Sequence, residues 1–125
     1  MMKLENQVVS LELAKKLKEL GVKQESLFYW VRRDMQADDS VVQIMQNKIH
    51  ESYGETLCSA FTVAELGEML PKEKMTFVNW FESGWRIDYG TERDEHSRVG
   101  AHLIDKNLAN AIAKMVIYLL ENKII

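Results

Sequence analysis

The fold of this chain is decided by its last apolar stretch, Asp105-Lys-Asn-Leu-Ala-Asn-Ala-Ile-Ala-Lys-Met-Val-Ile-Tyr-Leu-Leu-Glu-Asn-Lys123. Hydrophobic side chains recur there at helical spacing, which predicts a helix over residues 105–123 with one wide apolar face. Asp105 is placed to cap the first free N–H groups, and Lys123 suits the negative end of the helix dipole. A helix this apolar has to be covered, and the simplest cover is a sheet.

Length and composition indicate one globular domain over residues 1–125. Hydrophobic residues make up 46% of the chain and charged residues 28%, and the net charge of −3 gives no overall basic field to attract nucleic acid or anionic lipid. The start of the chain contains no signal-peptide core, and no apolar run approaches the roughly 20 residues that span a bilayer. We therefore expect a cytoplasmic protein with no membrane partner, and the charge argues against nucleic acid.

Two further helices are expected earlier in the chain. The first covers residues 10–20, with Ser10 as its N-cap and Gly21 suited to the left-handed residue after the last turn. The second opens with the capping box Thr62-Val-Ala-Glu65, in which each end residue serves the free backbone N–H of the other. It is expected to stop at residue 70, because a proline follows and cannot continue a helix.

A first pair of strands is expected between these two helices. Residues 27–32 are short, aromatic and bounded by polar residues, and residues 41–45 form a plausible second strand that returns against them. Residues 46–58 give a weak signal. A continued strand, an irregular loop and a short helical turn all fit that stretch.

A second pair is expected as a β-hairpin within residues 75–89. The favoured register has a three-residue loop with Gly84 in the left-handed position and sets Asn79 opposite Ile87. A two-residue turn would instead set Trp80 opposite Ile87, and this slip would exchange the faces that the two strands share.

A charged connection over residues 90–103 then leads to the last helix. The predicted order of elements is α-β-β-α-β-β-α, with no long crossover helix between parallel strands. This order indicates an α+β fold, in which a mostly antiparallel sheet made of two hairpins carries three helices on one face.

The second hairpin supplies the candidate interaction surface. Because strands alternate their faces, Trp80 and Arg86 point away from the helices if Trp85 and Tyr89 point toward them. An exposed tryptophan beside an arginine suits a protein interface and could also stack on single-stranded nucleic acid. The alternative is that both faces of the hairpin are covered.

No catalytic, cofactor-binding or metal-binding pattern stands out in the sequence. The residues around Cys58 match no nucleophile signature, so a buried structural cysteine is the better interpretation. His96 and His102 lie in a polar stretch without zinc-binding spacing. A composite metal site of these histidines with Cys58 and a carboxylate stays open.

Three blocks of the chain carry a resemblance to known proteins: Ser10–Trp30, Ala60–Pro71 and Asn110–Lys123. Together they resemble a family of small uncharacterised proteins encoded by bacteriophages, prophages and other mobile elements of bacteria. No activity, cofactor or catalytic residue comes with the resemblance. It implies a bacterial cytoplasmic setting and an accessory role.

Three functions are consistent with the sequence. The first is a non-enzymatic binding module of phage origin that binds a host or phage protein, or itself as a homodimer. The second is a small hydrolase or nuclease that uses carboxylates and His96 or His102 with a metal ion. The third is binding of single-stranded nucleic acid through Trp80 and Arg86.

Overall fold

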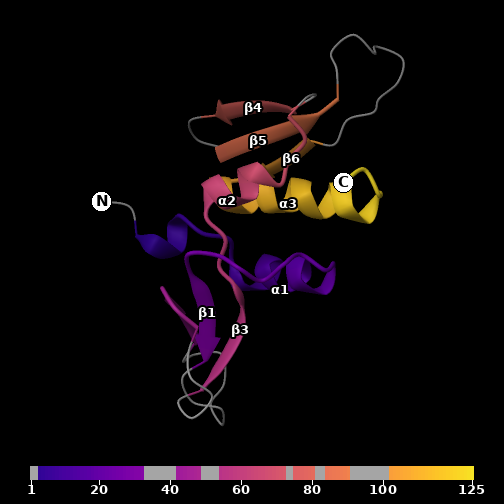
Figure 1. Ribbon diagram of the computed structural model, residues 1–125. Coiled ribbons are helices and arrows are strands. Elements are labelled where there is room, and N and C mark those ends of the chain that lie inside the picture. The colour runs from indigo at the N-terminus through magenta and orange to yellow at the C-terminus, as the bar shows by residue number, and fades with distance from the viewer. Residues whose placement is uncertain (1–2, 33–41, 49–53, 73–74, 81–83, 91–101) are drawn as a thin grey trace.

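The computed structural model describes residues 3–32, 42–48, 54–72, 75–80, 84–90 and 102–125 (Figure 1). Helices and antiparallel strands are mixed along this part of the chain, which confirms the α+β class. The elements are, in order, the 3-10 turn η1 (Leu4–Asn6), α1 (Leu11–Glu19), β1 (Tyr29–Arg32), β2 (Val42–Met45), β3 (Glu55–Ser59), α2 (Val63–Glu68), β4 (Met75–Trp80), β5 (Gly84–Tyr89), β6 (His102–Asp105) and α3 (Leu108–Glu121).

The strands form two antiparallel sheets, so the prediction of a single sheet is wrong. The strand orders are β2-β1-β3 and β4-β5-β6. Each predicted pair of strands has gained a third strand: β3 falls in the stretch that the sequence left open, and β6 falls at the end of the predicted charged connection. Both are only four or five residues long and end or begin with a charged residue, so they give little periodic signal.

Helix α3 lies between layers instead of on one face of one sheet. In Figure 1 the sheet β4-β5-β6 lies on one side of α3, and α1 with the other sheet lies on the opposite side. Helix α2 packs beside α3. The buried residues of α3 are Ala109, Ala111, Ile112, Ala113, Met115, Val116, Ile117 and Leu119. They cover most of its circumference, which is why one sheet is not enough to bury it.

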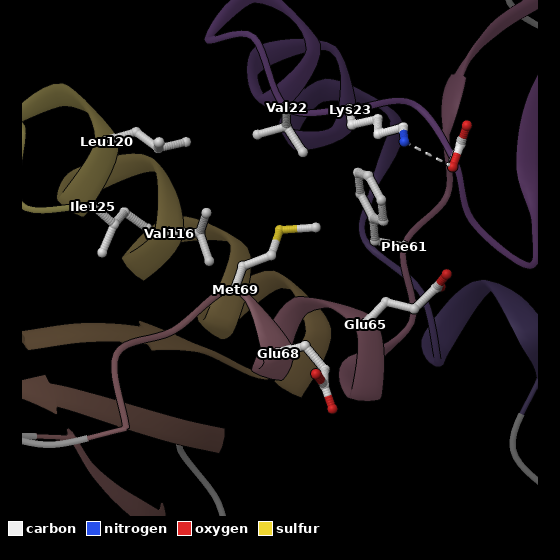
Figure 2. Close-up of a pocket in the computed structure, with 10 residues that line it drawn as sticks. Val22, Lys23, Phe61, Glu65, Glu68, Met69, Val116, Leu120 and Ile125 are labelled. Carbon is white, nitrogen blue, oxygen red and sulfur yellow. Dashed lines mark ion pairs between the residues drawn. The ribbon is translucent and has the colours of Figure 1, made fainter.

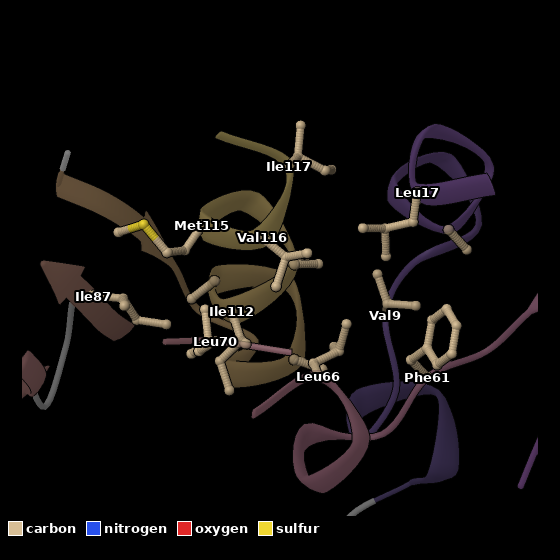
Figure 3. Close-up of a cluster of buried hydrophobic side chains, with 14 of the residues drawn as sticks. Val9, Leu17, Phe61, Leu66, Leu70, Ile87, Ile112, Met115, Val116 and Ile117 are labelled. Atoms are coloured by element: carbon tan, nitrogen blue, oxygen red, sulfur yellow. The ribbon is translucent and has the colours of Figure 1, made fainter. Parts of the chain in front are cut away.

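One continuous core runs through α3. Figure 3 shows Ile87 of β5 and Met115 on one side of the helix, and Val9, Leu17 and Phe61 on the other. Each of these side chains is at most 1% exposed. Burying an apolar side chain of this size contributes about 1.5–3 kcal/mol, so α3 is the element through which the two sides of the molecule stabilise each other.

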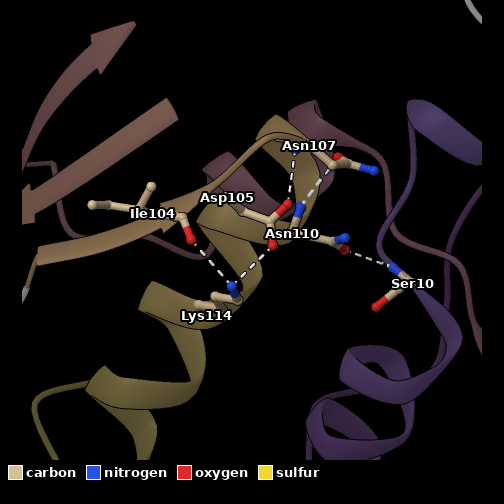
Figure 4. Close-up of polar contacts among 6 residues, drawn as sticks. All are labelled: Ser10, Ile104, Asp105, Asn107, Asn110 and Lys114. Atoms are coloured by element: carbon tan, nitrogen blue, oxygen red, sulfur yellow. Dashed lines mark hydrogen bonds and ion pairs between the residues drawn. The ribbon is translucent and has the colours of Figure 1, made fainter. Parts of the chain in front are cut away.

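The start of α3 differs from the prediction. The helix begins at Leu108, and its N-cap is Asn107, whose side-chain oxygen accepts the Asn110 N–H at 3.3 Å. Asp105 does not cap the helix because it still pairs with Trp85 as the last residue of β6. Its carboxylate instead accepts the Asn107 N–H at 2.8 Å and forms an ion pair with Lys114 at 2.9 Å (Figure 4).

The same end of α3 is bonded to the chain just before α1. The Ser10 N–H donates to the side-chain oxygen of Asn110 at 2.7 Å (Figure 4). The Asn107 side-chain amide donates to the Val8 carbonyl at 3.3 Å. Ser10 is the N-cap residue of α1, as predicted, but its side chain makes no capping hydrogen bond. These contacts join residues about 100 positions apart in the sequence.

The hairpin β4-β5 forms, with a register two residues away from the favoured one. Asn79 lies opposite Trp85, and Trp80 lies opposite Gly84. A shift of two residues keeps every residue on its predicted face, and Ile87 is accordingly fully buried in the core. The alternative with Trp80 opposite Ile87 is wrong.

Gly84 allows the close approach of β5 to the end of β6. Its φ is +100°, and a Cβ added there would lie 2.6 Å from both the Asp105 carbonyl oxygen and the Lys106 Cα. The obstructing atoms belong to the backbone and cannot rotate away. A side chain at residue 84 would therefore force the strands apart.

We predict that Gly84→Ala lowers the free energy of unfolding by about 2 kcal/mol or more, because it combines a positive φ with a backbone clash. Gly67→Ala is the matched control: Gly67 lies within α2, and an added Cβ has nothing within 4 Å. That change should instead raise the free energy of unfolding by about 0.5–1 kcal/mol. Urea unfolding followed by tryptophan fluorescence measures both, and equal effects would contradict the prediction.

Candidate functional site

A groove of about 500 Å³ opens between α2, the last turns of α3 and the segment that follows α1 (Figure 2). We call it the α2–α3 groove. Its apolar lining consists of Val22, Phe61, Met69, Val116, Leu120 and Ile125. The volume falls within the range of about 300–1,000 Å³ that is typical of ligand pockets. Phe61 and Val116 are only 1% exposed, so the floor of the groove is also part of the core.

The end of α1 places Val22 at this groove. Gly21 has a φ of +89°, and its N–H donates to the Lys18 carbonyl at 3.0 Å. The Val22 N–H donates to the Leu17 carbonyl at 3.1 Å, which completes a Schellman motif. The left-handed role predicted for Gly21 is confirmed, and the turn brings the next residue back over the helix end.

The end of α3 repeats this turn without glycine. Lys123 has a φ of 57°, and its N–H donates to the Leu120 carbonyl at 3.1 Å. The Ile124 N–H donates to the Leu119 carbonyl at 2.8 Å. The turn leads the chain back so that Ile125 lines the groove while remaining 43% exposed.

The predicted capping box of α2 is present and does more than start the helix. The Thr62 hydroxyl accepts the Glu65 N–H at 3.3 Å, and the Glu65 carboxylate accepts the Thr62 N–H at 2.9 Å. The second carboxylate oxygen of Glu65 accepts the Leu27 N–H at 3.0 Å. This bond joins α2 to the segment after α1, so two walls of the groove are connected through one side chain.

The segment after α1 is held at a second point. The side chain of Gln24 accepts the Ser59 N–H at 2.8 Å and donates to the Val22 carbonyl at 2.8 Å. The bond to Val22 fixes the backbone just before Lys23, and the bond from Ser59 holds Gln24, the residue just after it. Together with the bond from Glu65, they give the α2–α3 groove a preformed wall.

The charged residues at the groove are unequal in sign. Glu25, Glu65 and Glu68 line it together with one cation, Lys23 (Figure 2). Lys23 and Glu25 form an ion pair at 3.3 Å, but their side chains are 79% and 70% exposed. Water screens such a pair and leaves it weak. The rim therefore carries an excess of negative charge around an apolar floor.

The candidate surface predicted on the second hairpin is divided between two faces. Trp85 and Tyr89 are half-buried and pack against the core. Arg86 and Asp88 occupy the other face of β5 and form an ion pair at 3.2 Å. Trp80 ends β4 opposite Gly84, and its side chain lies outside the described residues. Binding through this surface stays a prediction.

Ile104 marks the face of this sheet that turns away from α3. It pairs with Arg86 across the strands, and it is 54% exposed. The Lys114 ammonium donates to the Ile104 carbonyl at 3.1 Å (Figure 4). A lysine that occupies a carbonyl of β6 opposes the addition of a further strand there. We call the face of the sheet β4-β5-β6 that carries Ile104 and Arg86 the outer sheet face.

Cys58 is buried on β3, as predicted, with 2% of its surface exposed. It borders a smaller cavity of about 210 Å³, which is also lined by Lys18 and Lys48. Burial raises the pKa of the Cys58 thiol above its ordinary value, and the charges of Lys18 and Lys15 only partly oppose this shift. The arrangement suits a structural thiol instead of a nucleophile.

No three metal-ligating side chains lie together within the described residues. His96 and the side chain of His102 lie outside that part of the chain, so the composite metal site stays a prediction. No helix in the described ranges is both long and apolar enough to cross a membrane.

Sequence reasoning did not single out the α2–α3 groove. Its lining comes from three separate parts of the chain, and each apolar residue there also fits an ordinary core position. The available signal was local: Gly21 marked the turn that positions Val22, and the capping box marked Glu65. Nothing in the spacing of these residues shows that they meet.

Comparison with known proteins identifies no relative: no family model, no curated protein and no solved structure matches this chain. The resemblance to proteins of bacterial mobile elements therefore stays a prediction.

We predict that Cys58, the one cysteine of the chain, reacts with iodoacetamide at pH 7.5 at least about tenfold more slowly than glutathione does, because it is buried and its thiolate is disfavoured. Unfolding in urea should restore the rate of a free thiol.

The same thiol should make the free energy of unfolding depend on pH. Above about pH 8.5 the unfolded chain loses the thiol proton first, so the contribution of Cys58 to the free energy of unfolding should fall as the pH rises. Rapid labelling of the folded protein at neutral pH would contradict the structural role.

Proposed function

We propose that the protein is a non-enzymatic protein-binding module and that its α2–α3 groove takes an apolar side chain of the partner. The supporting observation is the groove itself, with an apolar floor that is continuous with the core and walls fixed by hydrogen bonds. Interfaces gain much of their affinity from a large side chain that fills such a pocket.

The charged groups at the groove suit binding better than catalysis. The Glu65 carboxylate accepts three hydrogen bonds from the Thr62 backbone, the Thr62 hydroxyl and the Leu27 backbone. Those contacts hold the wall in place and occupy both carboxylate oxygens, so a substrate would have to displace them to reach the group. Glu25 and Glu68 are exposed, whereas a general acid or base needs a desolvated setting.

The proposed partner is a protein of the host or of the mobile element. The resemblance of three sequence blocks to phage and prophage proteins supports this setting. An accessory role of that kind needs a binding surface and no cofactor, and the α2–α3 groove supplies one. The outer sheet face around Ile104 is the competing surface.

The test uses a random dodecapeptide library displayed on yeast and selected on the folded protein. Two isoleucines offer a matched pair of variants: Ile125 lines the groove, Ile104 lies on the outer sheet face, and they are 43% and 54% exposed. We predict that Ile125→Asp weakens the selected peptides by at least about tenfold, roughly 1.4 kcal/mol, because it places a charge on the apolar lining. Ile104→Asp should change the affinity by less than about twofold.

Two results would contradict the proposal. One is a selection that enriches no peptide above background. The other is a set of peptides that loses affinity with Ile104→Asp and keeps it with Ile125→Asp, since binding would then take place on the outer sheet face. Because both isoleucines are partly exposed, neither variant should unfold the chain, and thermal unfolding verifies this.

A further inference from the structure

We propose that the partner segment bound in the α2–α3 groove is basic, with Lys or Arg next to the apolar side chain that enters the groove. This inference rests on the proposed function and adds the chemical identity of the partner. It is carried by the charges that the described residues place at the rim, which are three carboxylates and one ammonium group.

The carboxylates are arranged around the apolar floor. Glu65 and Glu68 lie three residues apart in and at the end of α2, so they follow one side of the helix. Glu25 comes from the segment after α1, on another wall of the groove. A cation beside the bound apolar side chain therefore meets negative charge from two walls, which favours Lys or Arg and disfavours Asp or Glu.

Glu65 contributes a charge whose position is already fixed. Its carboxylate accepts hydrogen bonds from Thr62 and Leu27, so little side-chain freedom is left to lose when a partner arrives. Its three bonds come from neutral donors, and the negative charge itself is not cancelled by them. The groove thus offers a preorganised negative site beside its floor.

Among the described residues that line the groove, Lys23 is the one cation, and it can be displaced. Its ion pair with Glu25 joins two highly exposed side chains, so breaking it has a small effect on stability. An arriving Lys or Arg can take the place of Lys23 at Glu25. Arginine is better suited to this exchange because its planar group can bind a carboxylate through two hydrogen bonds.

The same charges argue against two other occupants. A second copy of the chain that met this groove in a symmetric dimer would bring the glutamates of both copies together. Nucleic acid and other anionic ligands would be repelled by the same rim. A basic protein segment is the occupant that agrees with both the apolar floor and the charge.

The experiment compares two doubly substituted proteins that carry the same change in net charge. Glu25→Lys with Glu68→Lys reverses two rim charges, whereas Glu5→Lys with Glu12→Lys changes two exposed glutamates on η1 and α1. Peptides selected on the unmodified protein should be enriched in Lys or Arg next to an apolar residue. The rim variant should weaken them by at least about tenfold and the control by less than about twofold, with a smaller difference at high salt.

The outcomes separate this inference from the proposed function. The selected peptides could show no preference for Lys or Arg and still lose affinity with Ile125→Asp. That result would overturn the charge inference and leave the groove as the binding site. Equal weakening by the two double variants would also overturn it, because the effect would then follow net charge alone. If no selected peptide depends on the groove at all, the proposed function fails as well.

Discussion

The rest of this structure depends on the need to bury one helix that is apolar around most of its circumference. Helix α3 contacts the sheet β4-β5-β6 on one side, α1 on another and α2 beside it, and eight of its residues are buried. A single sheet would leave part of that surface in water, and the folded state would lose about 25 cal/mol of stabilising free energy for each Å² of apolar area left exposed. The polar contacts of Asn107 and Asn110 then fix the start of the helix against the chain before α1, so its position is set at one end by hydrogen bonds and along its length by packing.

Much of the local structure could be predicted from sequence because its causes are local. The capping box at Thr62, the left-handed Gly21 and the alternation of faces along β5 each depend on a few neighbouring residues, and each is present. The division into two sheets could not be predicted, because β3 and β6 are short and are stabilised by partners distant in sequence. The prediction that Asp105 caps α3 was wrong for a related reason, because pairing with Trp85 keeps Asp105 in a strand.

The α2–α3 groove is a consequence of how the core ends. Phe61 and Val116 are almost fully buried, yet they form its floor, so the site cannot change shape without disturbing the core. Two Schellman turns, at Gly21 and Lys123, bring Val22 and Ile125 to its edges. The turns are local, but the segments that they bring together are far apart in the sequence, so the spacing of residues in the sequence does not reveal the groove.

The most direct measurement is a nuclear magnetic resonance titration of the protein labelled with ¹⁵N, in which backbone amide shifts are followed as a selected basic peptide is added. A partner bound in the α2–α3 groove should shift the amides of residues 22–25, 68–69 and 120–125, which line or adjoin the groove. Shifts concentrated at Arg86 and Ile104, with the groove residues unchanged, would place binding on the outer sheet face and contradict the assignment of function to the groove.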